Sequence, residues 1–208
     1  MDTKSIRPKE KKIRVICVRT GDKFDQWYED NYKFMIDKYS GLEYDSFEVI
    51  EDNPYNNWFN KLQMYSKFKD GENLYFDLDV VIFGKLPNLV RKYFTLLDDT
   101  WWREPAHTPL NSSIVSWTGD VSYVWNTFKM YEDEHLKEYT RGSDEFYFEE
   151  INYYDTYEPV CPSIKDYLYE KPKDYNICTL GQMHHLMEKG WSGWYSNYFL
   201  PNQTQLEE

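Results

Sequence analysis

One apolar stretch, residues 73–83 (NLYFDLDVVIF), constrains the fold more than any other part of the chain. It is rich in β-branched and aromatic residues, which predicts a buried strand. Asp77 and Asp79 interrupt it, and on a strand this spacing places both carboxylates on one face. Carboxylates beside a hydrophobic strand are costly unless a positive charge offsets them. One hypothesis is a site for Mg²⁺ or Mn²⁺ and a diphosphate, because these ions prefer oxygen ligands. The other is two solvated aspartates in a turn.

The length and charge of the chain narrow the classes of protein to consider. With 208 residues, the chain is long enough for one domain with a substantial core. Its 24 basic and 36 acidic residues give a net charge of −12, which argues against a nucleic-acid backbone or an anionic membrane as the main partner. Aromatic residues make up 19% of the chain, which fits either a tyrosine-rich core or a surface that stacks against sugar rings.

The cysteine content and the N-terminus indicate a cellular compartment. Three cysteines without short paired spacing fit a reducing environment better than a disulfide framework. Residues 1–12 are polar, so no secretory signal is expected, and no apolar run is long enough to span a bilayer. We therefore expect a soluble protein of the cytoplasm, or of the host cytoplasm if a phage encodes it.

The first part of the chain alternates strand and helix patterns. Strands are predicted at 13–18, 47–50 and 73–83, with helices at 23–39 and 58–68 between them. This order is typical of a parallel sheet with crossover helices, in which ligands bind beyond the carboxyl ends of the strands. Residues 18–22, 51–53 and 77–79 should therefore converge at one edge, each group carrying an acidic residue.

The second part of the chain has weaker patterns. Helices are expected at 86–94, 121–139 and 146–153. Strands are expected at 95–97, 112–117, 158–161, 167–169 and 175–180. No repeat or convincing linker interrupts the chain. We expect one α/β domain over 13–200, with a mostly parallel central sheet flanked by helices, between tails at 1–12 and 201–208.

Several of these residues together resemble a known family. The order is an N-terminal strand, the segment WFNKL at 58–62, the acidic stretch YFDLDVVIF at 75–83, the triplet Asn111-Ser112-Ser113 and a later acidic loop. It resembles the GT-A-fold glycosyltransferases, especially the retaining enzymes of family 8 (the glycogenin and galactosyltransferase group) and their short bacterial and phage relatives. The similarity covers roughly residues 13–180 and is sharpest at 58–62 and 75–83.

The resemblance implies a metal site and a donor. Asp77 and Asp79 match the family's Asp-x-Asp motif, which holds Mn²⁺ or Mg²⁺ against a nucleotide diphosphate, with Asp77 also near the ribose. The ion acts as a Lewis acid on the charge that develops on the departing UDP. Lys61 matches a family lysine near the sugar nucleotide, although its position on a helix also fits an exposed lysine.

The resemblance also places residues around the nucleoside and the sugar. Val18, Arg19 and Thr20 fall at the nucleoside-binding end of the first strand, and Asp52 falls where an acidic residue can meet the base. Two further residues match the sugar end of the site. Asn111 matches an asparagine that faces the donor sugar, and Asp144 matches an aspartate near the anomeric carbon. The glutamine that follows this aspartate in the family is Glu145 here.

The C-terminal part departs from the family pattern. A metal-binding histidine shortly before a glycine and a diphosphate-binding lysine are expected there, but the chain has Cys178 before Gly181, followed by His184 and His185. Imidazole is a good Mn²⁺ ligand. Cys178, His184 and His185 are therefore alternative third metal ligands, and His184 is favoured, either on the metal or on the diphosphate.

The predicted activity is metal-dependent transfer of a hexose from UDP-glucose or UDP-galactose to a saccharide, protein or other acceptor, with retention as the resemblance implies. A front-face mechanism is expected, in which the donor phosphate deprotonates the acceptor and Asp144 orients the sugar. Two alternatives stay open. One is a haloacid-dehalogenase-like phosphatase with Asp77 as nucleophile, although its motif normally lies on the first strand. The other is a sugar- or nucleotide-binding module without turnover.

Overall fold

The computed structural model describes residues 12–55, 57–101, 108–179 and 193–201. Its centre is a six-stranded sheet of order β2-β1-β3-β6-β5-β7. The strands are β1 (Ile13–Val18), β2 (Ser46–Ile50), β3 (Glu72–Phe76), β5 (Thr95–Asp98), β6 (Leu110–Thr118) and β7 (Asp155–Tyr157). The β1–β2, β1–β3 and β5–β7 pairs are parallel, whereas β6 runs antiparallel to β3 and β5. The sheet is therefore mixed but mostly parallel, as predicted.

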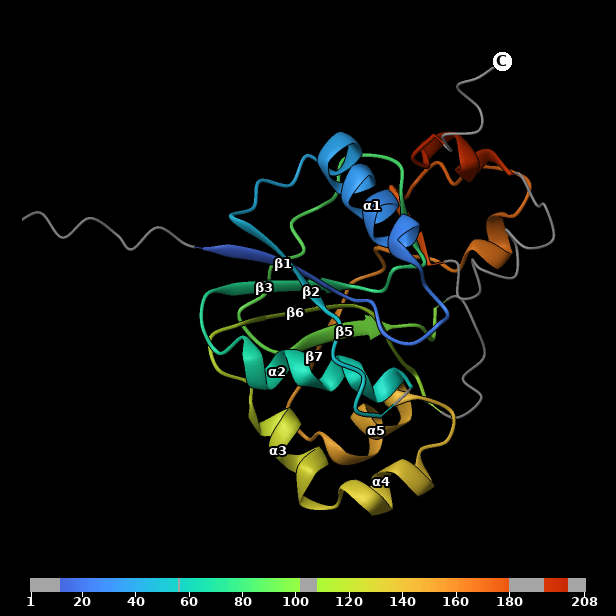
Figure 1. Ribbon diagram of the computed structural model, residues 1–208. Helices are drawn as coiled ribbons and strands as arrows, with labels where there is room; N and C mark the ends of the chain where they lie inside the picture. Colours follow the sequence, from blue (N-terminus) through green and yellow to red (C-terminus); the bar gives the residue numbers. More distant parts are fainter. Residues whose placement is uncertain (1–11, 56, 102–107, 180–192, 202–208) are drawn as a thin grey trace, which may run out of the picture.

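Helices cover both faces of this sheet (Figure 1). Helix α1 (Gln26–Met35), which continues as a π-helical turn at Ile36–Ser40, covers one face. The opposite face carries the 3-10 helix η2 (Trp58–Leu62), α2 (Gln63–Lys67), α3 (Tyr123–Met130), α4 (Glu132–Glu138) and α5 (Ser143–Glu150). Successive strand residues enter opposite cores: Val15 and Cys17 pack with α1, whereas Ile16 packs with α2. None of the helices described is long and apolar enough to cross a bilayer.

The acidic stretch differs from its prediction as one continuous strand. Strand β3 ends at Phe76, and the chain turns through residues 77–79 into β4 (Val80–Ile82). The Val80 N–H bonds back to the Asp77 carbonyl at 3.2 Å, which closes the turn. Strand β4 then pairs antiparallel with β8 (Ile177–Thr179) in a separate two-stranded sheet. Asp77 and Asp79 therefore flank a turn and do not share the face of a strand.

The second half of the chain shows further differences. Residues 86–94 form no helix; the Asn88 side chain accepts the Val90 N–H in a local turn, a bond that competes with helical hydrogen bonding. The predicted helix 121–139 is two helices that break at Tyr131. The break lets buried His135 pack on Phe128.

The short C-terminal elements are also shifted from their predicted places. The strands expected at 158–161 and 167–169 are absent from the described residues, which instead show β7 and a 3-10 helix, η3 (Ile164–Tyr167). Helix α5 begins at Ser143, three residues before the expected start at 146. A last 3-10 helix, η4 (Trp194–Tyr198), packs against the core that contains α1.

Candidate active site

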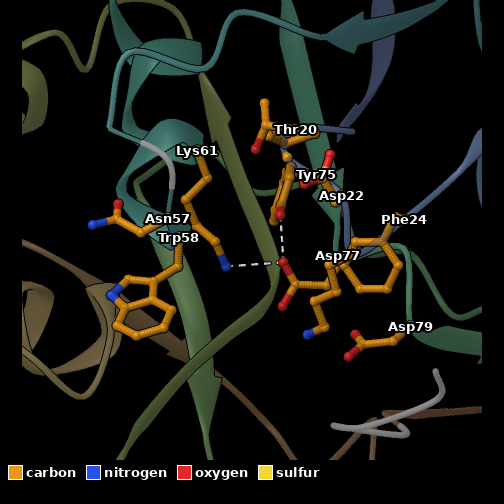
Figure 2. Close-up of a pocket in the computed structure, with 12 residues that line it drawn as sticks. Thr20, Asp22, Phe24, Asn57, Trp58, Lys61, Tyr75, Asp77 and Asp79 are labelled. Atoms are coloured by element: carbon orange, nitrogen blue, oxygen red, sulfur yellow. Dashed lines mark hydrogen bonds and ion pairs between the residues drawn. The ribbon is translucent and has the colours of Figure 1, made fainter. Parts of the chain in front are cut away.

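Two adjoining cavities open at the carboxyl ends of β1 and β3. Their volumes are about 350 and 500 Å³. Strand β6 runs antiparallel to β3, so its amino end reaches the same edge of the sheet. Both cavities are lined by five common residues: Lys23, Trp58, Lys61, Asp77 and Asp79. Figure 2 shows Lys61 and Asp77 meeting at the centre of this region.

Lys61 and Asp77 form the ion pair at the floor of the cavities. The Lys61 Nζ lies 2.8 Å from Asp77 Oδ1 and 3.0 Å from Ser112 Oγ. Burial alone lowers the pKa of the Lys61 ammonium, but the carboxylates of Asp77 and Asp144 outweigh it and raise this pKa. Only 7% of Lys61 is exposed, so the interpretation of this residue as an exposed helix lysine is wrong.

A second donor holds the same carboxylate. The Tyr75 hydroxyl donates to Asp77 Oδ1, the oxygen that also accepts from Lys61. The turn is fixed through its backbone as well, because the Asp77 N–H donates to the Ser113 carbonyl at 2.9 Å. The Asp77 side chain is therefore positioned by three elements: β3, η2 and β6.

Asp79 is the least compensated carboxylate of the site. It is 6% exposed. Burial first, and then the negative charge of Asp77, raise its pKa to about 6, although Lys23 and Lys61 act in the opposite direction. A divalent cation between Asp77 and Asp79 would relieve this cost, since carboxylate oxygens are ligands that Mg²⁺ and Mn²⁺ prefer. The residues present therefore fit such an ion.

Cys178, one of the three residues expected as a third metal ligand, lies away from the two cavities. This thiol is buried in the core that contains α1, and burial raises its pKa above the ordinary range of a cysteine. Its strand neighbour Thr179 lines the larger cavity instead. His184 and His185 lie outside the described residues. Within the described ranges, no three His, Cys, Asp or Glu residues cluster closely enough to hold a metal.

Asp144 and Asn111 lie along the wall of the larger cavity. Asp144 Oδ1 accepts the Ser112 N–H at 3.0 Å and also the Ser112 hydroxyl. Burial raises the pKa of the Asp144 carboxyl, whereas Lys61 and Ser112 lower it, and the net direction is upward. Asn111 precedes this serine, and its own side chain accepts the Ser113 N–H at 2.9 Å.

The residues predicted to meet the nucleoside divide into two groups. Val18 and Thr20 line the smaller cavity. Arg19 instead pairs with Glu29 at 2.7 Å and with Glu51, and it lines neither cavity.

Asp52 also lies away from both cavities. It pairs with Lys67 at 2.6 Å, and two-thirds of its side chain is exposed. The structure therefore does not bring Arg19 or Asp52 into the site, because each points toward a charged partner on a neighbouring element.

The structure adds residues that the sequence did not single out. Lys23 and Trp58 line both cavities, Tyr75 and Ser112 hold the ion pair, and Arg141 lines the larger cavity. Spacing could have identified two of them. Tyr75 precedes Asp77 by two residues and Trp58 precedes Lys61 by three, and these spacings place side chains on one face of a strand or helix. Lys23 belongs to the predicted helix 23–39 but lies in the loop before α1, which begins at Gln26, and Arg141 lies in a loop between predicted elements.

Solved structures of glycosyltransferases share this fold. A glycosyltransferase involved in glycosylation of the major capsid of PBCV-1 matches with a TM-score of 0.55 and 15% identity, over 86% of this chain and 98% of its own. The galactosyltransferase LgtC, in complex with donor and acceptor sugar analogs, matches with a TM-score of 0.55 and 9% identity, over 94% and 100% of the two chains. GlyE of Streptococcus pneumoniae TIGR4 matches with a TM-score of 0.50 and 13% identity, over 71% of this chain and 45% of GlyE.

This structural similarity establishes the fold, which is that of the GT-A glycosyltransferases. No protein-family model matches the chain, and no curated protein matches its sequence.

Proposed function

We propose that the protein is a metal-dependent glycosyltransferase that transfers a hexose from UDP-glucose or UDP-galactose to an acceptor, with retention of anomeric configuration. The observation that carries the proposal is the convergence of Lys61, Asp77, Asp79 and Asp144 on two joined cavities at the carboxyl edge of the sheet. Open α/β sheets bind their ligands at this edge. The fold shared with glycosyltransferases supports the same activity.

Each end of the site suits a different part of the donor. Val18 and Thr20, on the smaller cavity, would contact the nucleoside. Asp77 and Asp79 would hold Mn²⁺ or Mg²⁺, which supplies Lewis-acid stabilisation of the leaving diphosphate when bound. His184 is the proposed third ligand and also the alternative contact for the diphosphate.

The larger cavity would hold the hexose and the acceptor. Asn111 would face the sugar, and Asp144, fixed by Ser112, would orient it near the anomeric carbon. Lys61 pairs with Asp77 and so offsets one of the negative charges that an anionic donor would meet in the cavity. A front-face reaction, in which the donor phosphate takes the acceptor proton, requires no further basic side chain.

The first test is a thermal-shift and hydrolysis panel with UDP, GDP, UDP-glucose and UDP-galactose, each with Mn²⁺, Mg²⁺ or EDTA. A ligand that binds the native state raises the Tm by mass action. Metal-dependent stabilisation by UDP, with slow release of sugar from one donor, is the expected result. Stabilisation without release, in the presence of acceptors as well, would instead indicate a binding module.

The phosphatase alternative makes a different prediction for the same panel. It requires Asp77 as a nucleophile, yet Asp77 Oδ1 already accepts from both Lys61 and Tyr75. The shared glycosyltransferase fold also favours transfer over phosphoester hydrolysis. A covalent phosphate on Asp77, with no response to nucleotides, would overturn the proposed function.

A further inference from the structure

Trp58 is an exposed aromatic side chain at the junction of the two cavities. It lines both of them, and 47% of the residue is exposed. Its neighbour Phe59 is 1% exposed and belongs to the core with α2. Among the described residues, the indole neither packs against another aromatic ring nor donates its N–H. This ring is open to a ligand, and ligand cavities are lined predominantly by hydrophobic and aromatic side chains with a few polar groups beside them.

The local backbone aims this ring into the site. The Asn57 side chain accepts the Phe59 N–H at 2.9 Å and thereby fixes the start of η2. In a 3-10 helix, residues three apart lie on the same face. Trp58 and Lys61 are three apart in η2, and Figure 2 shows the Lys61 side chain reaching Asp77 while the Trp58 ring lies on the other side of the Lys61 ammonium.

Gly142 lies beside the edge of the indole and adds no side chain there. Gly142 has φ +138°, which disfavours any other residue, and a Cβ built there would lie 3.9 Å from the Trp58 Nε1. The bare backbone at Gly142 leads directly into Ser143 and Asp144, which line the larger cavity. Trp58 and Asp144 therefore border the same cavity.

We propose that Trp58 is a stacking surface for a pyranose ring, a role that rests on the proposed function and deepens it. An aromatic face covers the C–H face of a sugar, while charged and hydroxyl groups at its edge bind the sugar hydroxyls. Here the aromatic face is Trp58, and the polar groups are Lys61, Asp77 and Asp144. The ring belongs either to the donor hexose or to a saccharide acceptor, and the experiment distinguishes these two sources.

The experiment compares wild type with Trp58→Ala and Trp58→Phe in the full chain with Mn²⁺. Calorimetry gives the Kd of UDP, UDP-glucose and UDP-galactose. Rate assays give kcat and KM for donor hydrolysis and for transfer to lactose and to methyl glucosides. Tyr131→Ala is the matched control, because Tyr131 is 56% exposed and lines neither cavity.

If the indole stacks on the donor hexose, Trp58→Ala raises the Kd and the hydrolysis KM of the UDP-sugar about three- to tenfold and changes the Kd of UDP less than twofold. If it stacks on the acceptor, the acceptor KM rises by the same factor and the donor constants do not. In both cases Trp58→Phe restores most of the loss, and Tyr131→Ala has no effect.

Two results would overturn this role. One is that Trp58→Ala matches wild type with every sugar-bearing ligand that wild type uses. The other is that Trp58→Ala raises the Kd of UDP as much as the Kd of the UDP-sugar. The indole would then act on the nucleoside or on the shape of the cavity. A wild-type protein that neither binds UDP nor releases sugar would instead refute the proposed function, so the two failures are distinguishable.

Discussion

A buried basic side chain lies at each end of the β1–β3 strand pair, but the acidic groups around it differ between the two ends. At the amino end, Arg14 is 8% exposed, donates to Asn73 and to the Asp70 backbone, and lies 4.7 Å above the Phe68 ring. Its charge partner, Asp70 at 3.1 Å, is 85% exposed. At the carboxyl end, Lys61 faces Asp77, Asp79 and Asp144 together.

The difference separates a structural cluster from a candidate site. The Arg14 guanidinium donates three hydrogen bonds, and its one charge partner, Asp70, stays exposed to water, so this cluster needs no further ligand to offset its charge. Lys61 instead faces three aspartates in a poorly hydrated place, and this excess of negative charge costs free energy that a bound cation would offset. Sites commonly hold such unfavourable charge, because a ligand offsets it.

The largest expected effect comes from Asp79→Asn. It should reduce metal-dependent activity at least about 100-fold, since one of two proposed metal ligands is lost. In the absence of metal, it should increase the free energy of unfolding by about 1–3 kcal/mol, because a carboxyl whose pKa rises to about 6 favours the neutral form in the folded state. Activity assays and urea unfolding with EDTA measure the two changes. Near-wild-type transfer by this variant would refute the metal assignment.

Lys61→Ala should have the next largest effect. The change leaves Asp77 and Asp79 without their shared ammonium, so the Kd of the UDP-sugar should rise about tenfold or more and stability should fall by about 1–3 kcal/mol. Calorimetry and thermal unfolding measure these quantities, with Lys67→Ala as the control, because Lys67 forms an exposed pair with Asp52. Unchanged donor affinity together with a large stability loss would make Lys61 a packing residue.

Arg14→Met should affect stability alone. It removes three hydrogen bonds at the amino end but leaves Asp70 hydrated, so we expect a loss of about 1–2 kcal/mol. Because this cluster lies away from both cavities, kcat/KM should stay within about twofold of wild type at a temperature where both proteins are folded. A change in donor KM would mean that the two ends of the strand pair are coupled.

The smallest effect is a pH dependence of stability without metal. The pKa of Asp79 is raised in the folded state, so its contribution to stability is greatest at low pH and is lost as pH rises from about 4 through about 6. In EDTA, wild type should therefore lose about 1 kcal/mol or more relative to Asp79→Asn between pH 5 and 7. Denaturant unfolding at several pH values measures this difference. Parallel curves for the two proteins would contradict the uncompensated charge on Asp79.

The sequence predicts the first half of the fold because its signals there are local. Periodic apolar residues define β1, α1, β2 and β3, and the alternation of strand and helix implies parallel pairing. The same pattern brings Asp77 and Asp79 to one edge, and the family resemblance adds Lys61, Asn111 and Asp144, which line the larger cavity.

The remaining features depend on contacts that no local pattern contains. The turn at 77–79 exists because β4 leaves the main sheet to pair with β8, a strand about 100 residues later. Arg19 lies at the end of β1, as predicted, yet its side chain pairs with Glu29 and Glu51 and lines neither cavity. Tertiary contacts therefore determine the turn at 77–79 and the direction of the Arg19 side chain, as they do the break between α3 and α4.

The pairing of β4 with β8 also has a consequence for cooperativity. The register joins Val80 to Thr179 and Ile82 to Ile177, so the acidic turn is bonded on its far side to a segment near the end of the described chain. Apart from an isolated bridge between Thr179 and Ser163, neither three-residue strand pairs with another strand among the described residues, so most of each ladder is lost when the other strand detaches. In native-state hydrogen exchange, the amides of β4 and β8 should open together as one unit, separately from the six-stranded sheet. The turn that carries Asp77 and Asp79 joins these two units, so its shape depends on both.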